Sequence, residues 1–248
     1  MKEGIIIQAR TGSTRLHNKI LLPFYRGKRI IDILIENIQT AFPDTTIVLA
    51  TTTREQDEVL VNIAKEAGIN YFRGSEDNVL ARFIDATEAF GIDRLIRVCS
   101  DNPFLQVSSF AELFAMQGNY DYIGFGFADG CPSIKTHLGL YSEFTTADAL
   151  RRAAALTQEK LYQEHVTNYL YTHPETFAIR LLPLPEILEG RRDLRFTLDT
   201  MEDFSLLQEL YTLHKETTDG TLTSLLQLVE ATPQYSQRMV QNIIANEK

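Results

Sequence analysis

The residues that could do chemistry begin with segment 8–19, which combines cations with glycine and small hydroxyl side chains. Backbone amides beside small residues can hold phosphate oxygens while arginine and lysine neutralise their charge. The segment lacks the glycine spacing of a P-loop and of a dinucleotide fingerprint. It predicts a phosphate-binding loop, and an ordinary polar turn is the alternative. The residues concerned are Arg10, Gly12, Ser13, Arg15 and Lys19.

Two aspartates each follow an apolar run that is typical of a strand. Asp101 comes after residues 95–99, and Asp199 comes after residues 194–198. Ligands of open parallel sheets bind outside the carboxyl ends of the strands, and carboxylate oxygens suit Mg²⁺. Each aspartate has a structural alternative, because Asp101 can form a turn and Asp199 can cap the next helix. Together with the basic loop, the pair predicts metal-assisted phosphoryl or nucleotidyl transfer.

An alternation of short apolar runs and amphipathic patterns positions these segments. The β-branched run at 5–7 predicts a buried strand, and residues 29–41 place their apolar side chains on one helical face. In the first half we expect strands at 5–7, 47–50, 70–73 and 95–99, and helices at 29–41, 55–67 and 77–90. Strands and helices joined by short connections predict an α/β fold, a mostly parallel central sheet with helices on both faces.

The second half of the chain is less regular. We expect strands at 137–144, 177–184 and 194–198, helices at 146–156 and 158–172, and further helices to the C-terminus. The aromatic residues between 120 and 127 are typical of core. We interpret residues 1–248 as a single domain in which about 120–190 form a substrate or dimerisation subdomain, and we expect a homodimer.

Composition excludes several classes of protein. Hydrophobic residues make up 44% and charged residues 23% of the chain, which is typical of a globular protein and not of a disordered one. No charge-free stretch is long enough for a membrane span, and the acidic start of the chain is not typical of a signal peptide. Two cysteines suggest neither a disulfide framework nor a cysteine zinc site. We therefore expect a cytoplasmic protein without a membrane partner.

The charge is unevenly distributed. A net charge of −9 disfavours nucleic acid as a partner, because nucleic-acid binders need a basic footprint. Residues 1–29 nevertheless hold seven basic side chains and one acidic one. A positive end on an acidic protein favours a local site for a small anion. A solvated basic edge is the alternative.

The string at 6–16, Ile-Ile-Gln-Ala-Arg-Thr-Gly-Ser-Thr-Arg-Leu, with Lys-Ile-Leu at 19–21, resembles the opening signature of the cytidylyltransferase family, whose members make CMP-activated acidic sugars. Further similar segments are 72–80, 100–103, 137–141, 164–167 and 197–200. The resemblance spans about residues 4–215. It is greatest to the branch named after a spore-coat polysaccharide biosynthesis protein.

This resemblance implies a Rossmann-like nucleotidyltransferase fold of the glycosyltransferase-A type. It implies transfer of CMP from CTP to a sugar acid of the nonulosonate or octulosonate type, with release of pyrophosphate, for surface polysaccharide synthesis. The implied phosphate ligands are Arg10, Gly12, Ser13, Arg15 and Lys19, with Lys19 nearest the departing pyrophosphate. Arg73, Ser75 and Asp77 are implied near the base and ribose. Asp101 and Asp199 are implied to hold Mg²⁺ and, with Lys19 and Arg10, to carry catalysis.

Two alternatives stay open at this point: a nucleotide-sugar-dependent glycosyltransferase of the same fold, and a non-catalytic nucleotide-binding module. The absence of a short Asp-x-Asp run near 99–103 counts against the first, and the retained charged residues count against the second. His165 is interpreted as a packed or interface histidine. His137 is open between a contact with the sugar carboxylate and a structural role.

Overall fold

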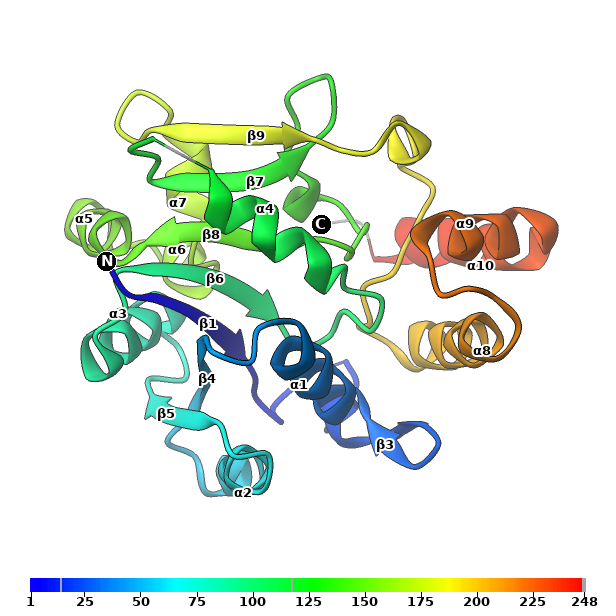
Figure 1. Cartoon of the computed structure of the whole chain (residues 1–248), viewed down its shortest axis with the longest axis horizontal. Helices are drawn as coiled ribbons and strands as arrows, with labels where there is room; N and C mark the ends of the chain where they lie inside the picture. Colours follow the sequence, from blue (N-terminus) through cyan, green and yellow to red (C-terminus); the bar gives the residue numbers. More distant parts are fainter. Residues whose placement is uncertain (14, 117, 247–248) are drawn as a thin grey trace.

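In the computed structural model, which describes residues 1–13, 15–116 and 118–246, seven strands form one twisted sheet in the order β5-β4-β1-β6-β8-β7-β9 (Figure 1). β1 pairs in parallel with β4 and β6, β4 with β5, and β7 with β9, whereas β8 runs antiparallel to β6 and β7. The mostly parallel sheet is therefore confirmed. The strands are β1 Glu3–Gln8, β4 Thr46–Thr52, β5 Asn70–Gly74, β6 Arg94–Cys99, β7 Tyr122–Gly126, β8 Glu143–Thr146 and β9 Ile179–Pro183.

Helices cover both faces of the sheet, as expected. Ile5 and Ile7 pack on one face against α1 (Ile30–Ala41), α2 (Glu58–Glu66) and α4 (Phe110–Ala115). Ile6 packs on the other face against α3 (Val79–Phe90), α5 (Ala147–Leu156) and α7 (Asn168–Thr172). All three isoleucines are fully buried, which explains why the strand is a continuous apolar run instead of an alternating one.

Three C-terminal helices, α8 (Met201–Thr217), α9 (Leu222–Ala231) and α10 (Pro233–Ala245), lie beyond the ends to which β1 and β6 point (Figure 1). α8 packs against a hairpin, β2 (Pro23–Tyr25) with β3 (Lys28–Arg29), which was not predicted. Its Phe24 ring lies 5.5 Å from that of Phe204. None of the helices in the described part of the chain has the length and apolar character of a membrane span. Short 3₁₀ turns occupy Lys19–Leu21, Glu55–Asp57, Val107–Ser109, Ser133–Lys135 and Glu186–Leu188.

Three expectations for the second half are wrong in detail. The helix expected at 158–172 is two short helices, α6 (Lys160–Glu164) and α7, interrupted around His165. The strand expected at 137–144 forms only at its end, as β8, and residues 194–198 form no strand. The apolar runs at 137–142 and 194–198 are mostly buried, but their backbones form only isolated hydrogen bonds among the described residues, to each other and to neighbouring loops. Burial alone therefore produced a strand-like pattern without a ladder of hydrogen bonds.

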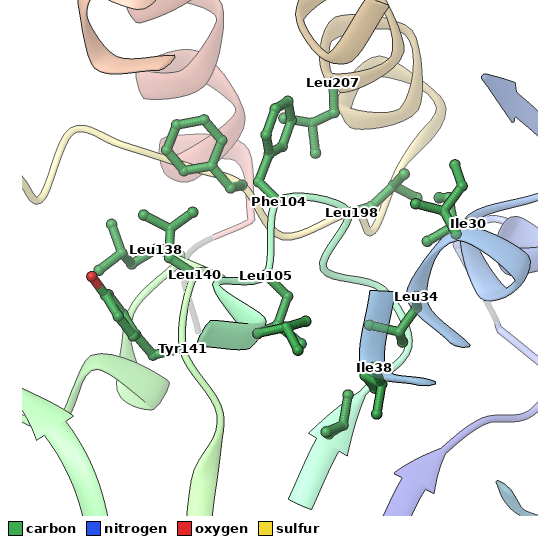
Figure 2. Packing of buried hydrophobic residues seen from close by; sticks show 14 of the residues in the cluster. Ile30, Leu34, Ile38, Phe104, Leu105, Leu138, Leu140, Tyr141, Leu198 and Leu207 are labelled. Atoms are coloured by element: carbon green, nitrogen blue, oxygen red, sulfur yellow. The ribbon is translucent and has the colours of Figure 1, made fainter. Parts of the chain in front are cut away.

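These single bonds bring the two aspartate-bearing loops together. The Leu198 amide donates to the carbonyl of Asp101 at 3.0 Å, and the Phe196 amide to the carbonyl of His137 at 3.0 Å. Gly139 has φ +61°, and a Cβ there would lie 2.8 Å from the Phe196 carbonyl carbon, so this close approach requires glycine. Figure 2 shows Leu198 with Phe104 and with Leu207 of α8 in the core that supports these loops.

Candidate active site

The loop after β1 is anchored by hydrogen bonds from Thr11 to the carboxylate of Asp57. The amide and hydroxyl of Thr11 donate to Asp57 Oδ1 at 2.8 and 2.6 Å, and the Thr52 hydroxyl donates to Asp57 Oδ2. Asp57 is 1% exposed. Because a buried carboxylate with several hydrogen bonds is expensive to disrupt, this residue fixes the start of the loop. Sequence reasoning missed Asp57, which lies in an otherwise polar segment without a distinguishing motif.

Lys19 joins the loop to both aspartates. Its Nζ donates to Asp101 Oδ2 at 2.7 Å, to the Leu198 carbonyl at 2.6 Å and to Asp199 Oδ1 at 3.4 Å. Burial by itself would lower the pKa of Lys19, but the charges and hydrogen bonds of Asp101 and Asp199 outweigh it and raise that pKa above its ordinary value. Lys19 is therefore a permanent ammonium at neutral pH. The three residues predicted to act together do meet.

Asp199 is held by further cations. Arg15 contacts its Oδ1 at 2.9 Å, and Arg195, which is 1% exposed, contacts its Oδ2 at 3.2 Å. The structural alternative, in which Asp199 caps the next helix, is wrong, because Thr200 is the N-cap of α8 and forms a capping box with Asp203. The Asp199 carboxylate instead faces the loop and its cations. Arg195 also pairs with Asp203 at 2.7 Å.

Two adjoining cavities meet at the carboxyl ends of β1 and β6. The first, here called the loop cavity, has a volume of about 280 Å³. The second, here called the strand cavity, has a volume of about 210 Å³. Residues that line the loop cavity include Arg10, Ser13, Arg15 and Lys19, and residues shared by both are Gln8, Cys99, Asp101, His165 and Asp199. The two aspartates therefore lie at the junction of one continuous cleft.

The remaining predicted residues lie apart from this junction. Arg73 donates to Glu58 Oε2 at 2.6 Å and to two backbone carbonyls, and it lines neither cavity. The Ser75 hydroxyl accepts from the Asn78 amide, and Asp77 is exposed. Gly12 is half-buried within the loop. Thr14, part of the similar string, lies outside the described residues.

The structure adds residues that sequence reasoning did not select. His165 was interpreted as a packed or interface histidine; it is exposed and lines both cavities, so the packed interpretation is wrong. Arg97 and Thr167 line the strand cavity. Arg97 interrupts the apolar run 95–98, and a charge within a buried strand was the available signal. His137 turns its Nδ1 to Arg195 and is not among the residues that line either cavity.

A mostly parallel sheet that presents a basic loop, an aspartate after β6 and a second aspartate before α8 across one cleft is typical of a nucleotidyltransferase-type α/β protein. Comparison with known proteins is more specific. The cytidylyltransferase family model matches residues 4–243, and the chain belongs to that family. It is accordingly an enzyme that uses CTP. Membership of this family argues against both alternatives, a non-catalytic nucleotide-binding module and a glycosyltransferase.

Three similar proteins illustrate the relationship. The spore coat polysaccharide biosynthesis protein SpsF of Bacillus subtilis is 34% identical over 239 residues, covering 92% of this chain and 94% of that protein. A cytidylyltransferase structure from Leptospira borgpetersenii has a TM-score of 0.82 at 26% identity and covers 96% of this chain and 97% of that chain. A CMP:2-keto-3-deoxy-manno-octonic acid synthetase complexed with CTP has a TM-score of 0.59 at 16% identity, covering 86% of this chain and all of the other. The Rossmann-like nucleotidyltransferase fold is thereby confirmed.

Proposed function

We propose that this enzyme transfers CMP from CTP to a hydroxyl of a sugar acid, of the nonulosonate or octulosonate type, and releases pyrophosphate for the synthesis of a surface polysaccharide. The observation that carries the proposal is Lys19, whose ammonium contacts both Asp101 and Asp199 at the junction of the two cavities. Phosphate-binding cations and metal-binding carboxylates thus meet at the place where a reacting phosphorus would lie between a nucleotide and an acceptor.

In this proposal the loop cavity takes the nucleotide. Arg10, Ser13, Arg15 and Lys19 line it and bind the phosphates, with Gly12 allowing the backbone to approach. Arg10 is 37% exposed and lies 3.9 Å from Glu164, a separation that leaves its guanidinium free to turn to a phosphate. In this proposal Arg73, Ser75 and Asp77 lie near the base and ribose, as the resemblance to the family implies, although none of them lines either cavity.

A divalent cation, Mg²⁺ in this proposal, suits the residues present. Asp101 and Asp199 both contact the Lys19 ammonium, which means that two carboxylates converge on one positive charge. Mg²⁺ is commonly held by one or two carboxylates together with substrate phosphates and water, so this pair provides a sufficient protein contribution. When bound, such a cation neutralises phosphate charge.

The strand cavity takes the acceptor in this proposal. Residues 133–141 and 165–171 supply much of its lining, which supports a substrate role for the subdomain at about 120–190. The acceptor oxygen attacks the α-phosphorus in line, its proton leaves to solvent, and the bond from that phosphorus to the pyrophosphate oxygen breaks. Lys19 and Arg10 stabilise the charge on the departing pyrophosphate, and positioning accounts for most of the acceleration. A homodimer and a cytoplasmic location complete the proposal.

The experiment is pyrophosphate release from CTP, UTP, GTP or ATP, with Mg²⁺, against a panel of sugar acids and neutral sugars. We expect release with CTP and a sugar acid. Release with another nucleotide, or with neutral sugars alone, would contradict the proposal. A pyrophosphate signal that appears without any sugar would indicate CTP hydrolysis and would contradict it as well.

A further inference from the structure

A buried ionic cluster lies beneath the strand cavity. Arg97 donates from Nη1 to Glu143 Oε2 at 2.6 Å and from Nη2 to Gln8 Oε1 at 3.1 Å. Glu143 also accepts from the Tyr122 hydroxyl at 2.8 Å and from Thr167 at 2.9 Å. The Arg97 and Glu143 side chains are 7% and 3% exposed. The guanidinium is therefore clamped in one position, and Glu143 has most of its acceptor sites occupied.

Polar atoms around this cavity lack partners. Arg97 Nε, Asn102 Oδ1 and Thr197 Oγ1 are buried without a hydrogen-bond partner among the described residues, and all three residues line the strand cavity. A guanidinium has five N–H donors, of which the contacts to Glu143 and Gln8 account for two. The guanidinium therefore retains donors for a polar group that binds in the cavity.

The charges around the cavity orient such a ligand. Among the described residues that line the strand cavity, Arg97 is the one arginine or lysine. Cys99, two residues after Arg97 on β6, lines the same cavity and does not supply a cation. Asp101 and Asp199 repel an anionic group at the other end. An acidic ligand thus binds with its carboxylate on the side of the cavity that Arg97 lines.

We propose that Arg97 is a specificity-determining residue, whose guanidinium, clamped by Glu143 and Gln8, binds the carboxylate of the acceptor and turns the reacting hydroxyl toward Asp101 and Asp199. This inference rests on the proposed function and assigns the acidic acceptor a particular partner. Guanidinium groups suit carboxylates because their planar donors match the two oxygens.

The test compares substrates that differ only in charge. Acceptors are 2-keto-3-deoxy-manno-octonic acid and related 2-keto sugar acids, each paired with its C1 carboxamide, and kcat/KM for the acceptor is measured at saturating CTP. We expect the unmodified enzyme to prefer an acid over its carboxamide at least tenfold. Arg97→Gln should abolish most of that preference by raising the KM for the acid, with the KM for CTP unchanged.

Cys99→Ser is the matched control, because Cys99 lines the same cavity and the substitution changes no charge. This variant should retain the preference for the acid over its carboxamide. Arg97→Lys keeps the charge with fewer donors and should retain part of the preference, which provides a second measurement if Arg97→Gln does not fold. Equal losses for acid and carboxamide would reduce Arg97 to a structural role and overturn the inference, as would an unmodified enzyme that uses both equally. No release from any acceptor would instead overturn the proposed function, and the inference with it.

Discussion

Three cations hold the Asp199 carboxylate at the junction of the two cavities. Arg15, Lys19 and Arg195 all contact it, and Lys19 and Arg195 also contact Asp101 and Asp203 respectively. The three cations balance these three carboxylates, so a divalent cation at Asp101 and Asp199 would leave an excess of positive charge. Such an excess favours a triphosphate, and we therefore expect metal and nucleotide to bind together.

The residue with the most direct test is Lys19. Replacing it by methionine in Lys19→Met removes a charge-assisted contact to phosphate, which typically contributes about 1.5–3 kcal/mol. CTP affinity in a calorimetric titration should therefore fall roughly 10- to 100-fold, since about 1.4 kcal/mol corresponds to a tenfold change. Lys28→Met is the control, because Lys28 pairs with Glu36 on the surface, and its CTP affinity should not change. A native affinity for Lys19→Met would exclude Lys19 from phosphate binding.

Asp199→Asn tests the metal assignment. The cap of α8 is Thr200, so the substitution removes charge without removing a helix cap. Turnover should fall by about tenfold or more, the scale at which metal-site partners act, and a higher Mg²⁺ concentration should be needed for half-maximal rate. Asp193→Asn, whose carboxylate pairs with Arg191, should behave as the unmodified enzyme. If the rate of Asp199→Asn depends on Mg²⁺ in the native way, Asp199 is not a metal ligand.

At the scale of elements, the start of α8 connects fold to site. Asp203 is the third residue of the helix, caps the backbone together with Thr200, and pairs with Arg195 at 1% exposure of both side chains. Arg195 in turn holds Asp199. The N-terminus of one helix thus fixes the direction of a carboxylate in the cleft.

Asp203→Asn should destabilise the protein by about 3 kcal/mol, because breaking a buried pair is costly and leaves Arg195 only its longer contact with Asp199. Burial by itself would raise the pKa of Asp203, but the hydrogen bonds and charge of Arg195 outweigh it and hold that pKa below its ordinary value of 3.8. The stabilisation from ionised Asp203 is complete above pH 3.8 and is lost as pH falls through the lower folded-state pKa.

The corresponding measurement is the thermal midpoint of both proteins from pH 7 to 3. Their difference should stay constant down to about pH 4 and shrink below it. Glu202→Gln, an exposed neighbour on the same turn, should show no such difference. A gap between Asp203→Asn and the unmodified protein that is independent of pH down to 3 would mean that the charge of Asp203 contributes little.

At the scale of the whole molecule, the cleft joins segments that are far apart in the chain. The 8–19 loop comes from its start, Asp101 from its middle and Asp199 from its last fifth. Ligands that bind all of them should stabilise the entire fold. At about 100 times its Kd, CTP with Mg²⁺ should add about 2.7 kcal/mol. For a chain of this size that corresponds to an increase in thermal midpoint of about 5–10 °C.

This shift should require both components. Differential scanning calorimetry with CTP and EDTA should give a small fraction of the shift, and GTP with Mg²⁺ at the same concentration should give less than CTP. An equal increase with EDTA would show that nucleotide binding does not depend on a metal, contrary to the charge balance at Asp199.

Sequence alone was sufficient wherever the signal is local. Buried β-branched runs and helical periodicity predicted the parallel strands and the helices of the first half, because each such element buries its own repeating pattern. The loop with Arg10, Arg15 and Lys19 was also evident, since its residues are neighbours in the chain. Its similarity to the cytidylyltransferase signature identified the family before any geometry was known.

Tertiary structure alone decided how distant residues meet. The run 194–198 has the apolar pattern of a strand, yet its backbone bonds only at single points, to His137 and Asp101, because Gly139 allows two loops to approach. The clamp on Arg97 by Glu143, and the contact of Asp199 with Arg195 next to Asp203, depend on pairings that no local pattern encodes. Composition and periodicity report how much of a residue is buried, whereas the identity of its partner is set by chain topology and packing.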